Sequence, residues 1–306
     1  MVIIKFDITI FPIVQLVKFH VNERWRNMQA LILEGGSFRP VFSCGIMDAL
    51  LEENVMFPYV IGVSAGIANG VSYVSRQPYR NIEIMRKYRN DKRYMGRRNF
   101  LKCRSIFGLD FVYDEIPNKL IPFDYETFRK YDGTCLVGVT EAENGKPEFY
   151  NALKCDTKFT MLRATCALPV FFPAIQMNGK YYYDGGLCAP IPIEKAEEDG
   201  CDRFLVILTR PEGYVKSVGK YDKIGAKIVG HKYPKVKERI LNRYKDYNKE
   251  VKRCEQLERE GKAIILRPEY PLKSFESDIE QLEKNYQHGY QMAKENMDKI
   301  KKIMGL

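Results

Sequence analysis

The feature that most constrains this chain is the pentapeptide GVSAG from Gly62 to Gly66, a G-x-S-x-G pattern. An apolar run at 58–62 predicts a buried strand before it, and small residues at 65–75 predict a helix after it. A strand that turns directly into a helix strains the serine backbone, and flanking glycines allow the close approach of the two elements. The pattern predicts Ser64 as a nucleophile at an elbow, with a structural turn as the alternative.

The surrounding sequence predicts an α/β fold. Residues 29–33 form a short apolar run followed by glycines, and apolar residues recur at helical spacing over 41–51. Further strand candidates follow at 134–142, 146–151, 181–184 and 203–209. This alternation favours a mostly parallel sheet with helices on its faces.

Three regions are expected along the chain. Residues 1–27 are interpreted as a leader or a misassigned start, because Met28 begins an apolar run typical of a first core strand. Residues 28–210 would form the catalytic domain. Residues 211–306 are basic and mainly helical in period, with a short strand or extended link at 264–272. No run reaches the roughly 18 apolar residues that a spanning helix needs.

A nucleophilic serine requires a base, and none of the histidines is at a position expected for one. The chain has three of them, His20, His231 and His288. None of them ends a predicted core strand, where an activating histidine would be expected. A Ser-His-Asp triad is therefore disfavoured.

A carboxylate is the remaining base, and Asp184 is the strongest candidate. It ends the strand YYYD and is followed by two glycines, which would leave it at the carboxyl edge of the sheet where α/β sites assemble. A carboxylate is a weaker base than imidazole, so it must lie close to the serine and be partly desolvated. The rival Asp132 follows a polar run and is interpreted as a turn residue.

An ester hydrolase also needs donors for the developing oxyanion. The glycine loop EGGSFRP at 34–40 lies between the first strand and its helix, where the N–H groups of Gly36 and Ser37 could serve. A phosphate-binding loop is the competing interpretation, but neither G-x-G-x-x-G nor the Walker pattern matches here.

The glycine loop, the G-x-S-x-G elbow and the D-G-G sequence, in this order, resemble the patatin-like phospholipase family. The resemblance extends to RATCALPVFFPA at 163–174 and LCAPIPIEKA at 187–196, and it covers most of 28–306. It implies a three-layer α/β/α patatin-like fold and a serine lipid acyl hydrolase that uses no metal and no cofactor. The substrates implied are phospholipids, lysophospholipids or related acyl esters.

By the same resemblance, Ser64 and Asp184 form a catalytic dyad and Gly35, Gly36, Ser37 and Arg39 form the oxyanion loop. The family loop usually reads G-G-G-x-R/K-G, whereas this chain has Ser37 at the third glycine and Pro40 at the last. Ser37 keeps an N–H to donate if its backbone angles suit a non-glycine residue. A catalytically weak or inactive lipid-binding or regulatory protein on the same fold is the alternative function.

The charge pattern bears on the partners. Residues 76–104 hold eleven Lys and Arg against two acidic residues, and residues 216–253 hold thirteen against four. These segments predict peripheral contact with an anionic membrane, with solvated helix faces as the alternative. Nucleic acid is disfavoured, because no recognisable binding motif accompanies the charge. Scattered cysteines, interpreted as reduced thiols, favour a cytoplasmic protein. Together with the basic segments, this predicts a location at the inner membrane face.

Overall fold

A computed structural model describes residues 28–306 of the chain. The expected leader at 1–27 lies outside the described residues. Among the helices of the described part, none is long and apolar enough to cross a membrane.

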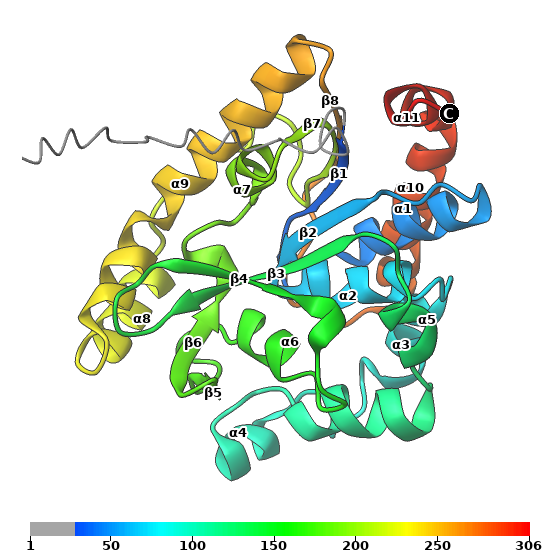
Figure 1. Cartoon of the computed structure of the whole chain (residues 1–306). Helices are drawn as coiled ribbons and strands as arrows, with labels where there is room; N and C mark the ends of the chain where they lie inside the picture. The colour runs from blue at the N-terminus through cyan, green and yellow to red at the C-terminus, as the bar shows by residue number, and fades with distance from the viewer. Residues whose placement is uncertain (1–27) are drawn as a thin grey trace, which may run out of the picture.

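An eight-stranded sheet forms the centre of the described part (Figure 1). Seven strands run in the order β5-β6-β3-β2-β1-β7-β8, and β4 pairs with β3 beside this path. The strands are β1 Met28–Leu33, β2 Tyr59–Val63, β3 Thr134–Glu141, β4 Pro147–Asn151, β5 Ile175–Met177, β6 Lys180–Asp184, β7 Cys201–Ile207 and β8 Ala263–Leu266. The path from β3 through β2, β1 and β7 to β8 is parallel, whereas β4, β5 and β6 pair antiparallel. The predicted α/β class with a mostly parallel sheet is confirmed.

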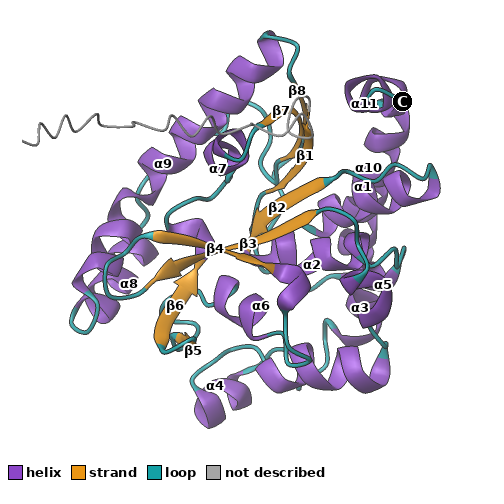
Figure 2. Ribbon diagram, viewed as in Figure 1, coloured by secondary structure: helices purple, strands orange, loops and turns teal. Residues whose placement is uncertain are grey.

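Helices cover both faces of the sheet (Figure 2). They are α1 Val41–Glu52, α2 Ser64–Val74, α3 Arg80–Tyr88, α4 Arg97–Cys103, α5 Tyr125–Arg129, α6 Thr160–Thr165, α7 Ile193–Glu198, α8 Lys220–Gly230, α9 Pro234–Arg259, α10 Ile279–Glu295 and α11 Met297–Met304, with a π-helix at Phe111–Leu120. Leu31 and Leu33 of β1 belong to the core formed with α1, α2 and α10. Ala30 and Ile32 belong to the core formed with α7 and α9. Because alternate side chains of β1 enter different cores, this strand is apolar throughout.

The C-terminal region is part of this architecture. β8 pairs in parallel with β7, so the sheet continues past residue 210, and the link at 264–272 begins as a strand. Helix α10 packs on α1, where two glycines allow backbone contact. A Cβ on Gly45 would lie 2.0 Å from the Tyr286 carbonyl oxygen, and one on Gly289 would lie 2.0 Å from the Phe42 carbonyl oxygen. The expected division into domains at residue 210 stays a prediction.

Candidate active site

Ser64 is the first residue of α2, directly after β2. Its φ of 52° lies in the left-handed region, which is strained for a residue with a side chain. The neighbouring glycines explain why the chain can fold this way. A Cβ on Gly62 would lie 2.8 Å from the Leu33 carbonyl oxygen, and one on Gly66 would lie 2.5 Å from that of Glu34. Only glycine at both positions lets the elbow pack directly on the end of β1.

Thr165, the last residue of α6, holds the elbow from the other side. Its hydroxyl accepts a hydrogen bond from the Ser64 N–H at 2.8 Å and donates one to the Gly138 carbonyl at 2.5 Å. Thr165 is fully buried. One hydroxyl therefore satisfies two backbone groups at the strained turn and ties it to β3.

Sheet register brings Asp184 to this elbow. Val63 pairs with Gly138 on β3, and the next residue of β3, Val139, pairs with Asp184 at the end of β6. Ser64 is 7% exposed and Asp184 is 1% exposed. The register therefore places Asp184 and Val63, the residue before Ser64, beside neighbouring residues of β3.

The carboxyl of Asp184 lies in an unusual environment. Oδ1 accepts a hydrogen bond from the Gly186 N–H at 2.8 Å, whereas Oδ2 is buried and has no hydrogen-bond partner within residues 28–306. Burial raises the pKa of this carboxyl, while the Arg243 charge, the Ser64 hydroxyl and the Gly186 N–H oppose the rise. A raised pKa makes the carboxylate a stronger base than an exposed aspartate.

The predicted oxyanion loop lies against the nucleophile. A Cβ on Gly35 would lie 2.7 Å from the Ser64 Cβ. Gly36 has a φ of 148°, and Ser37 has a φ of 57°, so the serine at the third loop position takes a left-handed conformation. The N–H groups of Gly36 and Ser37 have no acceptor in the described chain. Pro40 directly precedes α1, where its missing N–H breaks no helical hydrogen bond.

Arg39 lies in the same loop, but its side chain turns away from the pocket of Ser64. Nε donates to the Thr209 hydroxyl at 3.1 Å, Nη1 donates to the Ser274 hydroxyl, and Nη2 lies 3.8 Å from a Glu34 oxygen. Burial lowers the pKa of the guanidinium to about 10. Arg39 therefore anchors the loop to Thr209 and Ser274 rather than facing Ser64.

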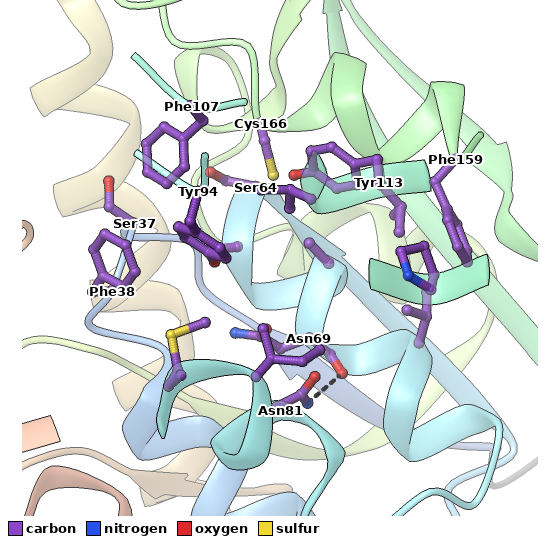
Figure 3. Close-up of a pocket in the computed structure, with 18 of the residues that line it drawn as sticks. Ser37, Phe38, Ser64, Asn69, Asn81, Tyr94, Phe107, Tyr113, Phe159 and Cys166 are labelled. Carbon is purple, nitrogen blue, oxygen red and sulfur yellow. Dashed lines mark hydrogen bonds between the residues drawn. The ribbon is translucent and has the colours of Figure 1, made fainter. Parts of the chain in front are cut away.

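Ser64 opens into a pocket whose space, including open solvent at its mouth, is about 990 Å³. Figure 3 shows Ser37 and Ser64 among aromatic side chains, with Cys166 and Tyr113 beside the nucleophile. Most of the lining is apolar, including Phe38, Ile84, Met85, Tyr94, Phe107, Val112, Phe123, Phe159, Leu162, Leu168 and Phe172. Such a pocket can take a hydrocarbon chain whose ester group lies at Ser64.

The described histidines lie elsewhere. His231 follows α8, and Nε2 of His288 accepts a hydrogen bond from the Glu269 N–H at 3.2 Å. Neither is among the described residues that line the Ser64 pocket.

Comparison with known proteins decides the family. The model of the family described as "patatin-like phospholipase" matches residues 31–197, more than half of the chain. The chain belongs to the patatin-like phospholipase family. Membership confirms the resemblance seen in the motifs. A domain of unknown function, DUF6363, matches residues 233–305.

Individual relatives of this patatin-like chain are distant. It is 24% identical over 187 residues to the uncharacterized protein YjjU of Escherichia coli, covering 60% of this chain and 52% of YjjU. It is 20% identical over 294 residues to lysophospholipase nte1 of Aspergillus terreus, covering 89% of this chain and 18% of that protein. The chain thus spans about half of one relative and less than a fifth of the other. The crystal structure of VipD from Legionella pneumophila matches with a TM-score of 0.45 at 14% identity, covering 89% of this chain and 67% of VipD.

Sequence patterns missed three side chains at this patatin-like site. Thr165 and Cys166 lie within RATCALPVFFPA, a segment that carried the resemblance without suggesting a role for either residue. Burial raises the pKa of the Cys166 thiol to about 12, and Asp184 adds to the rise. Arg243 comes from α9, where no motif distinguishes it from the other basic residues of the helix.

Proposed function

We propose that this protein is a serine lipid acyl hydrolase in which Ser64 is the nucleophile and Asp184 is its base. The observation that carries the proposal is the strained Ser64 next to a buried carboxyl, at the end of a large apolar pocket. The substrates would be phospholipids, lysophospholipids or related acyl esters, consistent with the family and with the name of the fungal relative, a lysophospholipase.

The reaction proceeds in two steps. Asp184 takes the proton from Ser64 as Oγ attacks the ester carbonyl, and the N–H groups of Gly36 and Ser37 stabilise the oxyanion. The intermediate collapses when the alkoxide leaves with the proton from Asp184, which gives an acyl-serine and an alcohol. Asp184 then deprotonates a water that attacks the acyl-serine, and the proton returns to Ser64 as the fatty acid is released.

The test is release of p-nitrophenol from butyrate and longer acyl esters, with a chelator present. Ser64→Ala and Asp184→Asn should each lose at least about 1000-fold in kcat, because a nucleophile or its base is removed. Asp132→Asn is the matched control, because it changes the other D-G aspartate and should retain activity. A wild type no faster than Ser64→Ala on any chain length would refute the hydrolase.

The left-handed Ser37 favours the second candidate, a catalytically weak or inactive lipid-binding protein on this fold. If the loop does not stabilise an oxyanion, Ser64 should fail to label with a fluorophosphonate probe while a fatty acid still binds in the pocket. Labelling of the wild type but not of Ser64→Ala would exclude this candidate.

We further propose that the basic segments 76–104 and 216–253 hold the enzyme at an anionic membrane. Exposed apolar side chains accompany the positive charge: Leu101 on α4 is 86% exposed, and Ile228 on α8 is 58% exposed. Gly225 of α8 lies near Val170, two residues before Phe172 of the pocket wall, so α8 lies close to one wall of the Ser64 pocket. Such a mixture of cations and exposed apolar groups suits a headgroup surface.

Charge reversal tests the membrane proposal. The double variant Lys223→Glu, Lys227→Glu on α8 should lose binding to vesicles of phosphatidylglycerol and phosphatidylcholine. Lys284→Glu, on the exposed face of α10 outside both segments, should bind as the wild type does. Unchanged binding of the double variant would contradict the proposal.

A further inference from the structure

A second pocket lies beside the proposed oxyanion loop and shares no described lining residue with the apolar pocket of Ser64. Gly35, Val63 and Gly186, all adjacent to the proposed catalytic residues, form part of its wall. The space between its walls, including open solvent at its mouth, is about 300 Å³. Its remaining wall comes from Glu34, Arg39, Pro190, Arg210, Tyr214, Lys216, Arg243 and Tyr247.

Three of these cations lack polar partners. Arg210, Lys216 and Arg243 make no ion pair and no side-chain hydrogen bond within residues 28–306. Arg210 lies 4.6 Å from the ring centre of Tyr214, and the Lys216 ammonium lies 5.3 Å from that of Tyr247. These ring contacts position Arg210 and Lys216 without neutralising their charges.

Arg243 reaches furthest toward the reaction centre. Its Nε is buried without a hydrogen-bond partner in the described chain. A Cβ on Gly186 would lie 3.4 Å from Arg243 Nη2 and 3.1 Å from Asp184 Oδ1. Some other cations of α9 are paired, as Arg253 is with Glu197 at 2.5 Å. An unpartnered guanidinium in a partly buried site has unused donors for an anion.

The pocket carries an excess of positive charge. Glu34 is the carboxylate in its wall and lies 3.8 Å from Arg39. The Asp184 carboxyl lies near Arg243, so the cations around the pocket still outnumber the acidic groups. Burial lowers the pKa of Lys216 to about 7, with further lowering by Arg243, Arg39 and Arg210 and an opposing effect of Glu34. An anion in the pocket would relieve the repulsion among these groups.

We infer that this pocket is an anion site that binds a phosphate group through Arg210, Lys216 and Arg243. Two guanidinium forks and an ammonium are suited to the oxygens of a tetrahedral anion. Two sources share this chemistry: the headgroup phosphate of an acyl lipid, and free inorganic phosphate. The headgroup source rests on the proposed hydrolase, because it puts the phosphate beside the ester held at Ser64.

Calorimetric titration with inorganic phosphate tests the site directly. Wild type should bind saturably below about 10 mM. Arg210→Gln and Lys216→Met should each weaken binding at least about ten-fold, the loss expected for one charged hydrogen bond. Lys245→Gln is the matched control, because it removes an exposed cation from the same helix as Arg243. Absence of saturable binding, or equal weakening in Lys245→Gln, would overturn the inference.

Competition on the Ser64→Ala variant separates the two sources without any hydrolysis. If the site takes a headgroup, a lysophospholipid should displace phosphate and a monoacylglycerol of the same chain length should not. If phosphate remains bound with saturating lysophospholipid, the site takes the free ion. Because no ester is cleaved, the result is independent of the p-nitrophenyl ester assay, and either hypothesis can fail alone.

Discussion

Replacing Thr165 by valine should damage both the fold and the reaction. Valine keeps the volume of threonine but leaves the Ser64 N–H and the Gly138 carbonyl buried without a partner. Each unsatisfied buried group costs about 1–3 kcal/mol, so the loss of two partners should lower the free energy of unfolding by about 2–6 kcal/mol. Because the Ser64 backbone is strained at a φ of 52°, loss of this bond should also let the elbow relax and lower kcat about 10- to 100-fold.

Thr165→Ser is the informative control. It keeps the hydroxyl and removes one methyl group, which should cost about 1 kcal/mol of stability and leave kcat nearly unchanged. Urea unfolding gives the stability of each variant, and hydrolysis of p-nitrophenyl butyrate gives kcat. The role of the hydroxyl is refuted if Thr165→Val unfolds within about 0.5 kcal/mol of wild type and keeps its kcat, or if the serine variant is the more damaged of the two.

Two further predictions concern packing and charge. Gly45→Ala should destabilise the protein by about 3 kcal/mol in urea unfolding, since the new Cβ would meet the Tyr286 carbonyl oxygen at 2.0 Å. The control Gly225→Ala in α8, where the nearest atom is 3.4 Å away, should be neutral or stabilising. Equal effects of the two substitutions would contradict this account. Burial raises the pKa of Asp184, so the folded protein binds this proton more tightly than the unfolded chain does. The resulting gain in the free energy of unfolding is fully present below about pH 4. It is lost as pH rises through the folded pKa, at about 1.4 kcal/mol per pH unit. Asp184→Asn should therefore be more stable than wild type at pH 7 but not at pH 3.5. Wild-type hydrolysis should fall as the carboxyl is protonated. A stability difference that does not depend on pH would argue against a buried charge.

Local sequence patterns predicted the parts of the candidate site that are formed by residues close together in the sequence. The elbow at Ser64 follows from a strand, a helix and two glycines within a few positions, and Asp184 follows from a strand end before two glycines. The strand predicted at 203–209 is observed at Cys201–Ile207, and the helix predicted at 41–51 is observed at Val41–Glu52. Apolar periodicity was sufficient there, because these elements lie in the core.

Long-range contacts could not be predicted in this way. The hydroxyl of Thr165 reaches a residue 101 positions away, and its side chain resembles any other buried threonine in the sequence. Arg243 is one of many cations on an amphipathic helix, and the sheet register that brings Gly186 beside it depends on β3 and β6 pairing. The π-helix at Phe111–Leu120 contains Pro117, which hides its helical character from a search for regular spacing.

The oxyanion loop depends on the far end of the chain. The Phe38 N–H donates to the Ser274 carbonyl at 3.1 Å, Arg39 binds the Ser274 hydroxyl, and α10 packs on the helix that follows the loop. During translation, a nascent chain can therefore form the elbow of Ser64 long before it can complete the oxyanion loop. The order of synthesis would therefore delay assembly of the proposed active site until α10 has left the ribosome.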